Sequence, residues 1–258
     1  MNIIGIDQVR FGVDDMEASR RFLGDFGLEE VEGGAAGATF LAADGSGLML
    51  RNMDDSDLPM GVTNGPTFRE TVWGAADAAT LEAIGAELAK DRQVQFGPDG
   101  VLRSTDDTGY GIAFRVAQRR PFESRPSLVN VPGQPPLRPL NQIADYDAPT
   151  RPSMLGHLVF FTPDLDRSVR FYTERLGFRV TDRFTGTGAF LRSAGSADHH
   201  NLFIVKREGM PAGLHHVAFH VRDQLEMMLG GRAMTAKGWE TAFGPGRHIF
   251  GSNHFWYF

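Results

Sequence analysis

The chain has 258 residues, of which 41% are hydrophobic, and its net charge at pH 7 is −6. No run of lysine or arginine favours nucleic acid or an anionic membrane, and no apolar run approaches the roughly 18 residues of a membrane span. Cysteine is absent, which excludes disulfides, thiolate metal sites and cysteine nucleophiles. The N-terminus lacks a basic stretch followed by an apolar one. We therefore expect a cytoplasmic protein that binds neither nucleic acid nor membrane.

The two halves of the chain follow one pattern in a constant register. A strand is predicted at residues 6–11 and another at 155–160, and a helix follows each of them. His157 lies 149 residues after Gln8, and the same offset holds along the helices that follow. In the second half we expect Thr162 to cap the helix. The constant offset indicates an internal duplication.

Each half then repeats the pattern of a strand, a helix and short strands. The predicted helices cover residues 15–27, 77–89, 162–177 and 223–237. Between the halves, residues 119–152 carry eight prolines and no periodicity, which indicates an extended linker packed along the surface. The expected domains are a first module at 1–118, the linker at 119–152 and a second module at 153–258.

The predicted fold class is α+β, with two tandem modules that each consist of a pair of β-α-β-β-β units. Short mixed sheets of this kind favour modules that close into half-barrels with a cleft inside. Duplication by itself says nothing about chemistry.

All eight histidines follow residue 156, so imidazole chemistry belongs to the second module. The predicted strand GLHHVAFHV (213–221) holds three of them, and each buried ring would need hydrogen-bond partners. Alternation along a strand places His216, Ala218 and His220 on one face, with His215 directed the other way. The small Ala218 leaves room beside the His216 ring.

His157 and His216 occupy equivalent places, each on the first strand of a unit in the second module. Pairing of these strands can bring the two side chains together in one half-barrel. Two histidines and one carboxylate, with the opposite positions open, are typical of non-haem Fe(II) oxygenases. The third ligand is expected from the last strand of the fourth unit, which we predict to begin at residues 254–258.

Several ordered motifs, LGHLVFF, DHHNL, GLHHVAFHV and GPGRH…SNHFWYF, carry a family resemblance. They resemble the second module of type I extradiol ring-cleaving dioxygenases, in the vicinal oxygen chelate (glyoxalase, bleomycin resistance, dioxygenase) superfamily. The resemblance implies that His157 and His216 bind Fe(II) or Mn(II), and that His200 is an acid–base residue near O2. It also implies that His248 and Tyr257 hydrogen-bond the substrate.

The resemblance further implies a glutamate as the third metal ligand, about ten residues beyond Phe258. We therefore expect the natural protein to extend beyond that residue. In the first module, Gln8 and Glu70 stand at the positions of the two ligand histidines, and Ala113 stands in the glutamate position. We interpret these first-module residues as relics with structural roles.

The expected activity is cleavage of a substituted catechol beside its diol with O2, by a protein that we expect to be a homo-oligomer. The expected substrate pocket includes His220, Phe243 immediately before the GPG sequence, and Arg247 next to the catalytic histidine. The alternatives are a metal-free binding protein of the same fold, such as a drug-sequestering protein, and a glyoxalase-type isomerase. A binding protein does not need these histidines together, whereas an isomerase should retain ligands in the first module.

Overall fold

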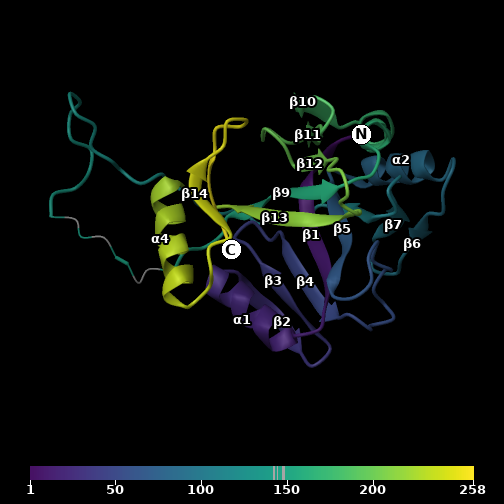
Figure 1. Ribbon diagram of the computed structural model, residues 1–258, viewed down its shortest axis with the longest axis horizontal. Helices are drawn as coiled ribbons and strands as arrows, with labels where there is room; N and C mark the ends of the chain where they lie inside the picture. Colours follow the sequence, from purple (N-terminus) through teal and green to yellow (C-terminus); the bar gives the residue numbers. More distant parts are fainter. Residues whose placement is uncertain (142, 144, 147–148) are drawn as a thin grey trace.

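The first module forms one eight-stranded sheet with two helices (Figure 1). Its first unit comprises β1 (Ile3–Val13), α1 (Met16–Phe26), β2 (Glu29–Gly34), β3 (Gly37–Leu41) and β4 (Gly47–Asn52). Its second unit comprises β5 (Thr67–Ala75), α2 (Ala78–Leu88), β6 (Gln95–Phe96), β7 (Leu102–Thr105) and β8 (Gly111–Val116). The strand order is β2-β3-β4-β1-β5-β8-β7-β6, so β1 and β5 join the two units at the centre.

The second module repeats this plan with one difference. It comprises β9 (Met154–Phe161), α3 (Leu165–Arg170) with a π-helical turn η1 (Phe171–Arg175), β10 (Arg179–Phe184), β11 (Gly188–Arg192), β12 (Leu202–Val205), β13 (Gly213–His220), α4 (Gln224–Ala236), β14 (Phe243–Arg247) and β15 (His254–Tyr257). Five strands form a sheet in the order β10-β11-β12-β9-β13, and β14 and β15 form a separate hairpin. The predicted α+β fold with β-α-β-β-β units is confirmed.

The difference concerns the edge of β13. In the first module β8 lies between β5 and β7, whereas the described residues of the second module place no strand between β13 and β15. The hairpin β14–β15 corresponds to β6–β7. The last described strand, β15, begins at His254 as predicted, but it pairs with β14 in a hairpin and not with β13.

Aspartates begin all four α-helices of the described chain. Asp15, Asp77, Asp164 and Asp223 are the N-caps, and each carboxylate accepts a hydrogen bond from the amide three residues ahead. The predicted cap Thr162 is wrong, because its hydroxyl instead pairs with the Ser168 hydroxyl at 2.7 Å.

One apolar core extends through both modules. Phe68 of β5 packs against Phe160 of β9 with ring centroids 5.0 Å apart, and Trp73 packs against Phe178 at 5.0 Å. These rings are buried, and they belong to one continuous cluster of apolar side chains. The two modules are therefore held together by their cores as well as by the linker.

The computed structural model describes residues 1–141, 143, 145–146 and 149–258. The described part of the linker has no helix or strand, and Figure 1 shows it projecting beyond α4, so the expected packing along the surface is wrong for much of its length. It returns to α4 through a cation–π contact between Arg232 and Tyr146. Among the described residues, no helix has the length and apolarity to cross a bilayer. The cytoplasmic location, the homo-oligomer and the domain boundaries stay predictions.

Candidate active site

The structure brings His157 and His216 together from neighbouring antiparallel strands. Ala218 of β13 lies opposite His157 of β9, and His216 lies opposite Val159, so the two histidines are offset by two residues along the ladder. The Nε2 atoms of His157 and His216 are 3.2 Å apart, and their ring centroids are 5.3 Å apart. Strand pairing thus achieves what the repeat predicted, a close pair of imidazoles on one face.

A β-bulge changes the predicted alternation next to this pair. Leu214 pairs with Phe160 and His216 pairs with Val159, so His215 is an extra residue on β13. His215 is exposed, yet its Nδ1 lies 2.7 Å from Nδ1 of His216. The expectation that His215 points away from His216 is therefore wrong, because the bulge interrupts strict alternation.

The two imidazoles are neutral, which is the form that binds a cation. Burial holds the pKa of His157 well below its usual range and lowers the pKa of His216 to about 3. With a metal–nitrogen distance of about 2.1 Å, nitrogens 3.2 Å apart would subtend an angle of about 100° at one ion. With this angle, the pair fits two positions of a metal site. Among the described residues, no group of three or more His, Asp or Glu side chains could hold a metal ion.

His200 lies against His157, and on its other side it contacts His199, which in turn contacts Asp182. The two ring centroids are 4.2 Å apart, and burial lowers the pKa of His200 to about 3. Its Nδ1 lies 3.0 Å from Nδ1 of His199, whose Nε2 lies 2.7 Å from a carboxylate oxygen of Asp182. His199 thus contacts His200 from outside the histidine pair.

The β14–β15 hairpin brings His248 and Tyr257 to the same place. The Tyr257 hydroxyl lies 3.2 Å from Nε2 of His248 and 3.5 Å from Nε2 of His216. The His248 ring stacks on Phe255 at 4.0 Å. Burial raises the pKa of Tyr257 and lowers that of His248, so a neutral phenol and a neutral imidazole face each other.

The three residues expected in the substrate pocket differ in their surroundings. His220 lies over Gly156, where an added Cβ would be 2.6 Å from its ring, so this glycine allows the ring to approach. Phe243 is 63% exposed and stacks on Phe255 at 5.0 Å. Arg247 is exposed, and its guanidinium donates to the Ser252 hydroxyl. Only His220 of the three lines the large cavity beside the histidine pair.

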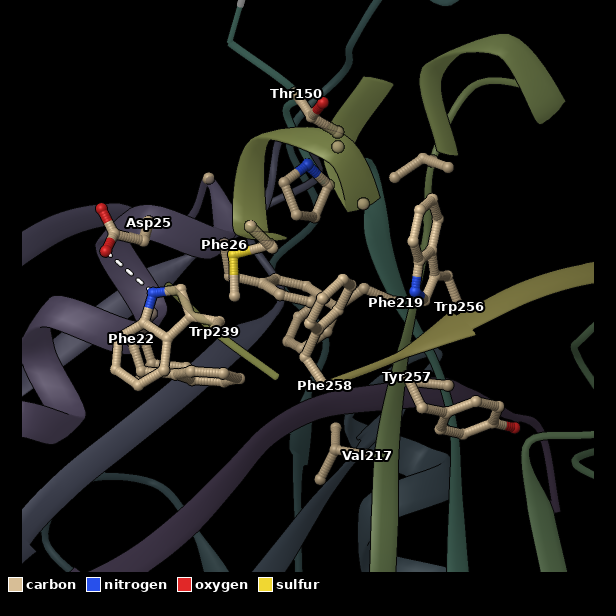
Figure 2. A pocket seen from close by; sticks show the side chains of 18 of the residues that line it. Phe22, Asp25, Phe26, Thr150, Val217, Phe219, Trp239, Trp256, Tyr257 and Phe258 are labelled. Atoms are coloured by element: carbon tan, nitrogen blue, oxygen red, sulfur yellow. Dashed lines mark hydrogen bonds between the residues drawn. The ribbon is translucent and has the colours of Figure 1, made fainter. Parts of the chain in front are cut away.

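That cavity has a volume of about 1220 Å³ and reaches from the histidine pair to the first module. Figure 2 shows Phe22 and Phe26 of α1 with Trp239, Phe219 and Phe258, whereas the Tyr257 ring is directed away from this group. The side chains that sequence reasoning missed here are Phe22, Phe26, Phe219, Trp239, Trp256 and Phe258. Phe22 and Phe26 are four residues apart and stack at 6.0 Å. Their spacing indicates an apolar helix face, but it does not indicate which residues that face contacts.

In the first module, the Arg10 side chain contacts both residues that stand at the positions of the two ligand histidines. Glu70 is 1% exposed, and its carboxylate pairs with Arg10 at 3.1 Å and with Arg103 at 3.5 Å. The Arg10 guanidinium also donates to the side-chain oxygen Oε1 of Gln8 at 3.1 Å. A guanidinium thus stands between the two residues that a metal would need.

Comparison with known proteins agrees with this geometry. Residues 154–257 match the family model of the Glyoxalase/Bleomycin resistance protein/Dioxygenase superfamily, and the second module therefore belongs to it. Metapyrocatechase 2 of Cupriavidus necator is 30% identical over 177 residues, which are 69% of this chain and 54% of that protein. A manganese-dependent 2,3-dihydroxybiphenyl 1,2-dioxygenase of Geobacillus genomosp. 3 is 32% identical over 85 residues, or 33% of this chain and 26% of that protein.

Solved structures share the fold over the whole chain. A Mn(II)-bound glyoxalase from Novosphingobium aromaticivorans matches with a TM-score of 0.74 and 24% identity, over 99% of this chain and 78% of that one. The 2,3-dioxygenase LapB of a Pseudomonas species matches with a TM-score of 0.72 and 19% identity, over 97% and 86%. The chain spans about half, or less, of the length of the curated relatives that it matches.

Proposed function

We propose that this protein is an extradiol dioxygenase that cleaves a substituted catechol with O2 at an Fe(II) or Mn(II) site. The observation that carries the proposal is the pair of neutral imidazoles, His157 and His216, with Nε2 atoms 3.2 Å apart. The names of the two curated relatives, a metapyrocatechase and a manganese-dependent dihydroxybiphenyl dioxygenase, support it.

In this proposal His157 and His216 hold the metal ion through Nε2. When bound, the ion lowers the pKa of a coordinated phenol and holds catechol and O2 side by side. His200 accepts and returns a proton at Nε2, because its Nδ1 faces His199. The Tyr257 hydroxyl and His248 Nε2 lie together and donate hydrogen bonds to substrate oxygens on which charge develops.

Oxygen uptake by the purified protein, loaded with Fe(II) or Mn(II), tests this activity. For the full-length protein, with the glutamate expected beyond Phe258, we expect one O2 consumed per catechol and about one metal ion per chain. A protein that consumes no O2 with any catechol in either loaded form would not be an extradiol dioxygenase.

The two alternatives find less support. A glyoxalase-type isomerase should keep metal ligands in the first module, where Arg10 instead pairs with Glu70 and Gln8. A metal-free binding protein has no need for a neutral histidine pair with a third histidine and a tyrosine against it. The apolar end of the cavity suits a binding protein, but it suits a bulky substrate equally well.

Replacing His200 with asparagine is expected to leave metal and substrate binding intact and to slow turnover. Positioned proton transfer contributes about 100- to 10,000-fold, so kcat should fall within that range while KM changes little. Metal analysis alongside steady-state oxygen uptake checks both parts. Loss of the metal in this variant would place His200 among the ligands and contradict the proposed roles.

Catechols with neutral or bulky apolar substituents are expected to be preferred over short carboxylated ones. Phe243 offers no partner for a carboxylate, whereas an apolar substituent gains roughly 25 cal/mol for each Å² that it buries. The aromatic part of the cavity, with Phe26 and Phe219 5.7 Å apart, gives such a substituent further surface.

The measurement compares kcat/KM for 2,3-dihydroxybiphenyl and for homoprotocatechuate on one preparation. Arg247 is the matched control, because its guanidinium is held by Ser252 and should not be needed. A preference for the carboxylated catechol that disappears in Arg247→Ala would show that Arg247 binds the anion.

A further inference from the structure

Tyr110 links the first module to the two strands that carry the histidine pair. It precedes β8, in the turn that Asp106 closes by accepting hydrogen bonds from the amides of Thr108 and Tyr110. Its side chain is 2% exposed, and its ring stacks on Phe160 of β9 at 4.4 Å. The turn and the stacking together fix where its hydroxyl lies.

The Tyr110 hydroxyl bridges the ends of β9 and β13. The amide of Gly213 donates to it, and the carbonyl oxygens of Phe161 and Gly213 lie 2.6 and 2.9 Å away as acceptors. Gly213 and Phe161 are direct partners in the register of the two strands. One hydroxyl from the other module therefore joins the terminal pair of this ladder.

The position of this bridge matters because of the bulge at His215. Phe161 follows His157 by four residues, and Gly213 precedes His216 by three, so the bulge lies between the bridge and the histidine pair. A slip of one residue turns a side chain to the opposite face of a sheet. Among the described residues, β9 is the strand that pairs with β13, so this ladder carries the register between the two histidines.

We propose that Tyr110 is a positioning residue that fixes the register of β13 and thereby holds His216 against His157. The inference rests on the proposed function for its consequence in metal binding, but the register itself can be measured without metal. The first module, in which Arg10 contacts the residues at both of its own ligand positions, Gln8 and Glu70, thereby contributes to the site of the second.

The test compares Tyr110→Phe with Tyr172→Phe in the otherwise unchanged protein. Both variants lose one buried phenol hydroxyl at the module interface and keep the ring, but the Tyr172 hydroxyl pairs with Asp106 at 2.9 Å instead of with β9 or β13. Nuclear Overhauser contacts between the His157 and His216 rings report the register in metal-free protein. Co(II) titration then reports metal affinity, with the visible spectrum as a signature of the ligand geometry.

Tyr110→Phe is expected to weaken the contacts between the two rings and to lower Co(II) affinity by about 10- to 100-fold with an altered spectrum, as for other residues that orient ligands. Tyr172→Phe keeps the Tyr110 hydroxyl but removes a hydrogen bond to Asp106 of the same turn, so it should change both by much less. Ring contacts that are the same in Tyr110→Phe as in the unaltered protein would overturn the inference, whatever the stability of the variant. If the unaltered full-length protein binds no Co(II), the proposed function fails, and the ring contacts still decide the role of Tyr110.

Discussion

Replacing His216 with alanine is expected to abolish metal binding and catechol cleavage. The variant removes one of two imidazole nitrogens that lie 3.2 Å apart, and alanine has no atom that can ligate. Loss of an outer partner of a ligand typically costs 10- to 100-fold in affinity or activity, so loss of a ligand itself should cost more than about 100-fold. Metal content by elemental analysis and oxygen uptake measure the two effects.

His254→Ala is the matched control. His254 is exposed at the start of β15 and lies at the wall of the large cavity, and we assign it no role in metal binding or proton transfer. This variant should keep both metal and activity. Unchanged metal content in His216→Ala would contradict the assignment of the ligands, whereas a loss in both variants would point to unfolding of the module.

Replacing Arg10 with methionine is expected to destabilise the protein by about 3 kcal/mol. The change leaves the Glu70 carboxylate, which is 1% exposed, without its nearer cation, and only Arg103 at 3.5 Å remains. Because Arg103 remains as a partner of Glu70, we expect the loss of stability to lie at the lower end of the range for broken buried ion pairs. Urea unfolding measures the free energy of unfolding.

Adding Glu70→Gln to Arg10→Met should restore most of the lost stability, because the buried charge is then gone. The pH dependence follows the same reasoning. Burial raises the pKa of Glu70 in the folded state, so the folded protein takes up a proton first as the pH falls. The deficit of Arg10→Met should therefore shrink with decreasing pH through that pKa. A deficit that is independent of pH, or absent, would mean that the ion pair has no such role.

The helix boundaries and the repeat were predictable because their signals are local. Asp15 and Asp77 precede apolar periodic segments, and the φ of 100° at Gly27, where α1 ends, is one that glycine adopts without strain. The repeat of the unit within the second module also placed His157 and His216 at equivalent strand positions. Since the equivalent first strands of the two units pair with each other in each module, their meeting followed from sequence.

The bulge at His215 could not be predicted in this way. Its existence depends on which residues of β9 face β13, and a strand sequence contains only its own alternation. The N-cap of α3 was also not predicted correctly. The Thr162 hydroxyl pairs with the Ser168 hydroxyl, and the Asp164 carboxylate accepts the capping hydrogen bond.

The sequence by itself therefore determined the duplicated α+β fold and the gathering of histidines in the second module. Tertiary structure alone decided what surrounds them, because contacts between side chains far apart in the chain leave no periodic signal. Arg10 fills the first-module site through a strand pairing, and Phe22 and Phe26 meet Trp239 and Phe219 only because the modules pack together. The hydroxyl of Tyr110 reaches Gly213 across 103 residues for the same reason.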